Sequence, residues 1–380
     1  MAFRFSHMAL SAALLTSAAF PAAAEPVFNR IASFPVAKNL PADKDTKSVT
    51  SAEIITASED GKTLIYSDSP LGGIGFIDIT DAKAPKAGGA LLLEGEPTSV
   101  AVAGLKVLAG VNTSENRANP SGKLVTVDIA TKKVEVSCDL GGQPDSVAVS
   151  PDRTFAAIAI ENERDEEVNE GALPQMPAGY LVTVGLKDGV ADCASLKKID
   201  VTGLAEISPE DPEPEFVSIN ANGEIALTLQ ENNHIVIIDG KTGAVKTHFS
   251  AGTVDLEGID TKTDGQLKFT DKQEGRKREP DAVKWLDNDR IVIANEGDWQ
   301  GGARGFTIFD KTGKLLYEAG ASLEHAVAAI GHYPEKRSKA KGIEPEGLET
   351  ATFDGQKYFF VLAERASIAA VYKDTGAEPQ

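Results

Sequence analysis

One short pattern recurs six times along the 380-residue chain and constrains its fold more than any other feature. Two strand-like runs are joined by a tight turn, with a polar or charged residue at each end of the pair, as in "EPEGLETATFDGQKYFFVLAER" (344–365). The other copies start at 51, 96, 143, 213 and 279, and most open with Glu-Pro or Gln-Pro. A third apolar or alternating strand follows each pair, and a fourth strand usually follows the third. Four short antiparallel strands in a repeat of about 45 residues predict a β-propeller blade.

The repeat predicts an all-β protein, a single propeller of six four-stranded blades over residues 25–380. A seventh blade would need residues 252–278 or 319–343 to form one, and both segments look too short. The last copy stops after three strands, at Lys373, whereas "VFNRIASFPV" (27–36) reads as a strand without a partner. We therefore expect this N-terminal strand to complete the last blade and close the ring.

The first 24 residues have the composition of a cleavable secretory signal: Arg4, an apolar run, and Ala22-Ala23-Ala24 as the cleavage site. No later apolar run reaches the roughly 18 residues that cross a bilayer. We expect an exported, periplasmic protein without a membrane span, and a monomer. In an oxidising compartment, Cys138 and Cys193 favour a disulfide over two unrelated thiols.

The chain is strongly acidic, with 57 acidic and 38 basic residues and a net charge of -19. This charge argues against nucleic acid or an anionic membrane surface as a partner. It is compatible with cation binding, although a solubilising surface would have the same composition.

Propeller topology predicts where the acidic residues gather. The connection into the first strand of a blade and the turn between its second and third strands lie on one face. Both ends of each hairpin therefore meet at one rim near the central channel. The predicted rim acids are Glu96, Asp145, Glu161, Glu213, Glu215, Glu231, Glu279, Asp281, Glu296, Asp298, Glu344, Glu346 and Glu364. Clustered carboxylates need protons or cations, and so many hard oxygen ligands suit Ca²⁺. Alternatively, an acid at a strand entry accepts hydrogen bonds from loop N–H groups and fixes the blade junction.

Specific roles follow from these positions and from five inserts expected on the same face, at 113–122, 164–179, 252–278, 298–305 and 319–343. Two inserts are basic, which suits a phosphate group, although solvated loops would look the same. The predicted metal ligands are Glu213, Glu215, Glu231, Asp281, Glu296 and Glu344. The predicted catalytic residues are Glu346, Glu364, Arg365 and Asp298, and the predicted substrate-binding residues are His234, Arg276, Arg278 and Lys339.

Three segments carry a resemblance to a known family: "EPEFVSINANGEIALTLQENNHIVIIDGKTG", "EPDAVKWLDNDRIVIANEGD" and "IEPEGLETATFDGQKYFFVLAER". They resemble the choice-of-anchor I family of exported bacterial β-propellers, whose members are often labelled alkaline-phosphatase-like. "EPEGL" together with "AER" is more loosely similar to the esterase-like phytase propellers. The resemblance implies the fold. The loop after "ANEGD" departs from the family pattern, because it is short and turns to "WQGGARG".

Two functional hypotheses follow. In the first, rim carboxylates hold Ca²⁺, and Arg365 or the basic inserts hold the phosphate of a small phosphoester that is hydrolysed. In the second, the chain is a non-catalytic exported propeller that binds a metal, a small ligand or a protein through the same face.

Overall fold

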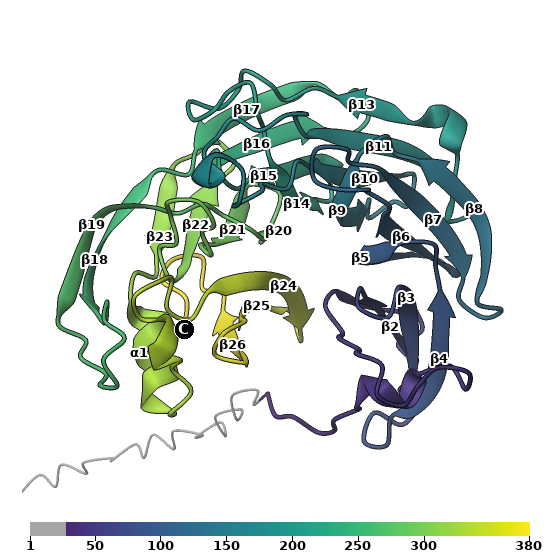
Figure 1. Ribbon diagram of the computed structural model, residues 1–380, viewed down its shortest axis with the longest axis horizontal. Helices are drawn as coiled ribbons and strands as arrows, with labels where there is room; N and C mark the ends of the chain where they lie inside the picture. The colour runs from purple at the N-terminus through teal and green to yellow at the C-terminus, as the bar shows by residue number, and fades with distance from the viewer. Residues whose placement is uncertain (1–27) are drawn as a thin grey trace, which may run out of the picture. The chain divides into compact units, whose positions relative to one another are not determined.

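The computed structural model describes residues 28–380, and the predicted signal segment 1–24 lies outside them. The compact unit Ile31–Gln380 consists almost entirely of short antiparallel strands, grouped as six successive propeller blades (Figure 1). This grouping of the strands confirms the predicted fold class and blade number. Within the described residues, no helix is long and apolar enough to cross a membrane.

The strands fall into one sheet per blade. Blade 1 contains β1 (Ile55–Ala57), β2 (Thr63–Asp68), β3 (Gly73–Asp78) and β4 (Lys86–Leu92). Blade 2 contains β5 (Glu96–Ala103), β6 (Lys106–Asn112), β7 (Gly122–Asp128) and β8 (Lys133–Asp139). Blade 3 contains β9 (Gln143–Val149), β10 (Phe155–Glu161) and β11 (Tyr180–Lys187), with β12 (Val190–Ala191) and β13 (Lys197–Ile199) both paired to β11.

Blade 4 contains β14 (Pro214–Ile219), β15 (Glu224–Leu229), β16 (His234–Asp239) and β17 (Val245–Ser250). Blade 5 contains β20 (Val283–Trp285), β21 (Arg290–Ala294), β22 (Phe306–Asp310) and β23 (Leu315–Glu318), and blade 6 contains β24 (Pro345–Phe353), β25 (Gln356–Ala363) and β26 (Ile368–Lys373). The turn between β24 and β25 is the predicted Asp354-Gly355. Both residues have positive φ, 49° and 80°, as a tight type I′ hairpin turn requires.

Serine hydroxyls join the first strands of neighbouring blades. The Oγ atom of Ser99 in β5 accepts a hydrogen bond from the backbone N–H of Val147 in β9, at 3.0 Å. Ser146 of β9 accepts in the same way from Val217 of β14, at 3.2 Å. Together with apolar clusters that pack one sheet on the next, these contacts fix the distance between the first strands around the ring.

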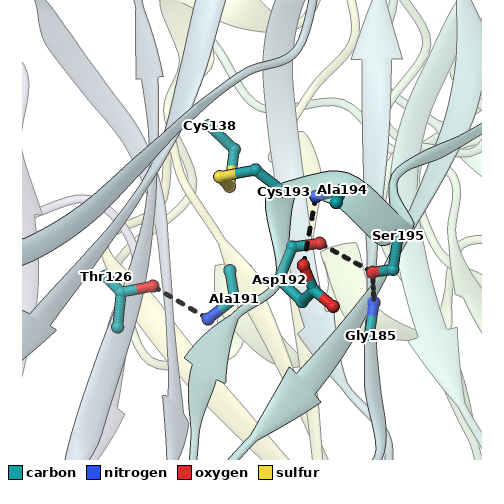
Figure 2. Close-up of a disulfide and its surroundings, with 8 residues drawn as sticks. All are labelled: Thr126, Cys138, Gly185, Ala191, Asp192, Cys193, Ala194 and Ser195. Atoms are coloured by element: carbon teal, nitrogen blue, oxygen red, sulfur yellow. Dashed lines mark hydrogen bonds between the residues drawn. A yellow bond between two sulfur atoms is a disulfide. The ribbon is translucent and has the colours of Figure 1, made fainter.

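A disulfide also links blades 2 and 3. Cys138 of β8 is bonded to Cys193 of the short 3₁₀ segment η3 (Cys193–Ser195), so the predicted pairing is confirmed (Figure 2). Nearby, the N–H group of Ala191 in β12 donates to the Oγ1 atom of Thr126 in β7, at 3.3 Å. The irregular outer edge of blade 3 is thus fastened to its neighbour.

The two long segments between blades do not form a seventh blade. Residues 252–278 contain a two-stranded hairpin, β18 (Thr253–Ile259) and β19 (Asp271–Lys277). Residues 319–343 contain α1 (Ser322–Ala329) and the 3₁₀ segment η4 (Glu335–Arg337). Arg304, which is fully buried, holds the second segment in place: its guanidinium pairs with Glu324 at 3.4 Å and donates to the backbone oxygen of Ser338 at 2.7 Å.

The closing strand that we predicted at 27–36 is not present among the described residues. Residues 28–35 form no strand, and the last sheet has three strands. The chain is instead held to blade 1 by η1 (Val36–Asn39), where the buried Asn39 amide donates to the backbone oxygen of Phe76 at 2.9 Å. At the edge of β26, Lys373 exchanges backbone hydrogen bonds with Gln380 of the C-terminal tail. These two contacts take the place of the predicted strand pairing, and the repeat pattern gives no sign of them.

Candidate functional site

The first strands of all six blades line a central channel. A cavity of about 450 Å³ is bounded by residues of β5, β9, β14, β20 and β24 and by residues 53–56 around β1. A second cavity, of about 230 Å³, lies at the end where these strands begin. The two cavities share Glu53, Ile54, Ser99, Ser146, Phe216 and Gly347, so they form one continuous space.

The smaller cavity is lined by one equivalent residue from each blade. These six residues, which we call the mouth ring, are Glu53, Thr98, Asp145, Glu215, Asp281 and Glu346. Each stands two positions after the start of the repeated motif, for example Glu215 in Glu213-Pro214-Glu215. The topology therefore turns a sequence repeat into a ring of five carboxylates and one hydroxyl at one end of the channel.

The carboxylates of the mouth ring repel one another in a poorly solvated place. Burial, together with the charge of Glu163, raises the pKa of Asp145 to about 7. Burial, with Glu296 and Glu364 nearby, raises the pKa of Glu346 to about 8. The same causes, burial first and neighbouring carboxylates second, raise the pKa values of Glu215 and Asp281 well above the ordinary range.

Three carboxylates of the mouth ring have no partner that would stabilise their negative charge in the described chain. Within the described residues, the side chains of Asp145, Glu215 and Asp281 form no ion pair or hydrogen bond. Asp281 is the most enclosed of them, with only 9% of its surface exposed. Because a buried charge without a partner is costly, these groups must carry protons or meet a cation.

The acids that open the motifs behave differently. The carboxylate of Glu279, which is fully buried, accepts hydrogen bonds from the backbone N–H groups of Asp298, Trp299 and Gln300, each at 2.9 Å. Glu213 accepts from the backbone N–H of Arg164 at 3.0 Å.

Glu344 is likewise fully buried, and its two oxygens accept from Arg337 at 2.7 Å and Arg365 at 3.0 Å. Two of the six predicted metal ligands, Glu213 and Glu344, therefore anchor inserts and turns. This agrees with the alternative that an acid at a strand entry fixes a blade junction.

A second group of acids, which we call the second layer, lies at the turns that follow the second strands of the blades. Lysine and arginine side chains pair with most of these carboxylates. Burial, with the charge of Asp298 nearby, raises the pKa of Glu231 well above its usual range, and the Arg164 guanidinium stands 3.9 Å from its carboxylate. Burial alone would raise the pKa of Asp298, but its pairing with Arg164 and the nearby charge of Lys341 help to lower it.

Two further acids of this layer pair with basic residues, whereas Glu161 accepts from the amide of Gln143 at 2.8 Å. Glu296 pairs with Lys341 at 3.2 Å and accepts from Gln230 at 2.7 Å. Glu364 pairs with Arg365 at 2.9 Å. Arg365 remains 44% exposed, the most accessible of the cationic side chains that neutralise this layer.

The residues predicted to bind substrate do not gather at the mouth ring. Arg278 is buried in a structural network with Glu318, at 2.8 Å, and Arg276 donates to the backbone oxygen of Gly302 at 3.3 Å. His234 is buried and lies 3.0 Å from a ring nitrogen of His248. Burial and this second imidazole lower the pKa of His234 to about 4, so the ring is neutral near pH 7. Lys339 is exposed and lies in neither channel cavity.

The donors suit Ca²⁺ in kind but not in position. Ca²⁺ takes six to eight oxygen ligands at about 2.3–2.6 Å. Among residues 28–380, no three acidic, His or Cys side chains stand close enough together to hold a metal ion. The mouth-ring acids come from five different blades and surround the cavity rather than converge on one point.

Sequence reasoning missed two members of the mouth ring, Glu53 and Thr98. The signal was present, since both occupy the same motif position as Glu215, although the first copy lacks the proline. It also missed Arg164, which neutralises part of the second layer. No local pattern marks it, because it pairs with an acid of another blade.

Comparisons with known proteins bear on the fold and the family. Among solved structures, the chain is similar to virginiamycin B lyase from Staphylococcus aureus (TM-score 0.48, 11% identity, 85% of this chain and 84% of that chain). It is also similar to Kuenenia stuttgartiensis hydrazine synthase (TM-score 0.39, 17% identity), covering 49% of this chain and about half, 52%, of that one. These likenesses are too distant to carry an argument about activity.

No curated protein matches the chain. The family model of the choice-of-anchor I domain matches residues 53–301 and 299–377, which includes every blade. The chain therefore belongs to the choice-of-anchor I domain family.

Proposed function

We propose that this protein is an exported binding propeller whose channel mouth takes up a cation. The observation that carries the proposal is the set of three mouth-ring carboxylates, Asp145, Glu215 and Asp281, that line one cavity without a positive partner in the described chain. Most other acids on this face are paired or hydrogen-bonded, and Glu96, which is not, is exposed to solvent. A bound cation would replace the protons that these groups otherwise need at neutral pH.

The experiment is thermal unfolding of the mature chain at pH 8 in EDTA and then with Ca²⁺, Mg²⁺ or 1,4-diaminobutane at matched ionic strength. A cation that binds the folded mouth raises the melting temperature, and at equal concentration the tighter-binding cation raises it more. Asp281→Asn should remove that rise. The matched control is Glu96→Gln, which removes a charge from an exposed first acid outside the mouth ring. If none of the cations raises the melting temperature, the proposal fails.

A second candidate is Ca²⁺-dependent hydrolysis of a phosphoester, and Arg365 is the observation that favours it. Its guanidinium is partly exposed and its charge acts on Glu346 of the mouth ring, so it could hold a phosphate beside the carboxylates. Any bound Ca²⁺ would polarise the phosphoryl group. The test is turnover of a generic phosphomonoester in Ca²⁺. Hydrolysis that is lost in Arg365→Ala, while the melting temperature stays within a few degrees, would favour catalysis. No turnover would leave binding as the function.

A further inference from the structure

We infer that the cation taken up at the channel mouth is an aliphatic polyamine rather than a metal ion. This inference rests on the proposed function and names the ligand class of the same site. Three features of the channel carry it: the spread of the acids, the enclosed Asp281 and the apolar side chains on the wall beneath them.

The spread of the acids fits several separated positive charges. The mouth-ring carboxylates belong to five blades and face a cavity of about 230 Å³, and no three of them converge as metal ligands within the described chain. A metal ion is a point charge that needs its ligands within one coordination shell. A polyamine places ammonium groups several bonds apart, and each ammonium offers three donors to different carboxylates.

Asp281 points independently to a ligand. Its side chain is nine-tenths buried, lines the cavity and forms no ion pair or hydrogen bond within residues 28–380. Acids that merely solubilise a surface are exposed, and acids that fix loops are hydrogen-bonded, as Glu279 is. An enclosed carboxylate on a cavity wall is suited to an ammonium group that enters from the mouth.

Below the mouth ring, apolar side chains stand among polar ones on the channel wall. Ile54 and Phe216 line both the mouth cavity and the larger cavity behind it. Methylene groups between ammonium charges would pack against these side chains, whereas a hydrated metal ion would gain nothing from them. An aromatic ring also favours an organic cation placed over its face.

Deeper inside, an acid of the larger cavity already has a partner. Glu349 pairs with Lys284 at 3.0 Å, and the Lys284 ammonium stands 5.7 Å from the centre of the Phe216 ring. A polycation meets its unpaired carboxylates at the mouth ring, so it should lodge there instead of passing through.

The test is isothermal titration of the mature full chain with spermidine, 1,4-diaminobutane, 1-aminobutane and Ca²⁺ at pH 8 and equal ionic strength. We expect spermidine to bind most tightly and the monoamine about tenfold more weakly than the diamine, because it meets fewer carboxylates. Asp281→Asn should weaken spermidine binding about tenfold, and Glu96→Gln should leave it unchanged. Phe216→Leu should weaken binding of spermidine but not of any Ca²⁺.

The outcomes separate this inference from the proposed function. Ca²⁺ binding that depends on Asp281, without spermidine binding, would overturn the polyamine and leave the cation site standing. Equal affinity for the monoamine and for spermidine would also overturn it. If no cation binds, both proposals fail together. Should Asp281→Asn fail to fold, Glu215→Gln provides the same test from another blade.

Discussion

Two carboxylates of the same motif, two residues apart, have opposite environments in this protein. In blade 5, Glu279 is fully buried and accepts three backbone hydrogen bonds, whereas Asp281 lines the channel mouth with no partner in the described chain. In blade 6, Glu344 is held by two arginines, while Glu346 faces the mouth ring and its own carboxylate neighbours.

The difference shows that acids at the two positions of the repeated motif have different structural roles. The first acid of the motif stands where the chain enters the blade, so its neighbours are loop N–H groups and insert side chains. The second acid lies near the start of the first strand, or two residues before it in blades 1 and 5, and it lines the channel mouth. Its neighbours there are the equivalent acids of other blades. Position within the blade, and not residue type, separates a structural acid from a candidate ligand.

The largest effect should come from removing a first acid. Glu279→Ala leaves three partly buried N–H groups without their acceptor, so we expect the free energy of unfolding to fall by about 3 kcal/mol. Asp281→Ala removes a carboxylate from the same motif but leaves no donor unpaired, and it should cost less than about 1 kcal/mol. Denaturant unfolding of both variants at pH 7 measures the contrast. Equal losses would mean that the two acids do not differ as proposed.

The mouth ring should also make stability fall as pH rises. The folded pKa values of Asp145 and Glu346 are raised to about 7 and about 8, above the ordinary values near 4 that these groups have when unfolded. Between those limits the folded state holds more protons than the unfolded state, so the stability that these two groups contribute is fully present below about pH 4 and is lost as the pH rises towards 8.

In cation-free buffer we therefore expect the melting temperature to drop by a few degrees from pH 5 to pH 8. The charged groups that act on Asp145 and Glu346 are Glu163, Glu296, Glu364 and Arg365, together with the neighbouring acids Glu161, Glu215 and Asp281. The double variant Asp145→Asn, Glu346→Gln should flatten the decrease, whereas Glu96→Gln should not. A melting temperature that rises over this range in the wild-type chain would contradict the assignment.

The fold could be read from the sequence because it is local and repeated. Six copies of a hairpin with a third strand leave few alternatives to a propeller, and the Asp354-Gly355 turn follows from two residues. The closing strand could not be predicted, because the contact of Asn39 with blade 1 and the pairing of Lys373 with Gln380 depend on the assembled ring.

The candidate site shows the same limit. The sequence placed Glu215, Asp281 and Glu346 on the correct face, but it grouped them with Glu213 and Glu344, because residue type alone does not reveal hydrogen-bond partners. The partners come from other blades: Arg164 reaches Glu213 and Asp298, and Lys341 reaches Glu296. Arg278 was predicted to bind substrate, but in the structure its guanidinium pairs with Glu318.

A smaller effect of opposite sign is expected at Asp281. Because its pKa is raised by burial and by other carboxylates, charging it near pH 8 costs free energy in the absence of a cation. Asp281→Asn should therefore stabilise the cation-free protein at pH 8 by about 1 kcal/mol, with little change at pH 5. Denaturant unfolding at the two pH values provides the measurement. Destabilisation at both would indicate an unrecognised structural partner.

The smallest effect should arise in blade 2, where the first acid departs from its counterparts. Glu96 opens the motif Glu96-Pro97-Thr98, yet its side chain is exposed and forms no ion pair or hydrogen bond within residues 28–380. We expect a first acid to stabilise the fold only where loop N–H groups donate hydrogen bonds to it. Glu96→Gln should therefore change the free energy of unfolding by less than about 0.5 kcal/mol. Glu279→Gln, which keeps one acceptor oxygen for three donors, should cost more than Glu96→Gln in the same denaturant experiment. A large loss of stability in Glu96→Gln would instead show that the motif stabilises every blade through its own backbone geometry. First and second acids would then differ only in that the second acid lines the channel.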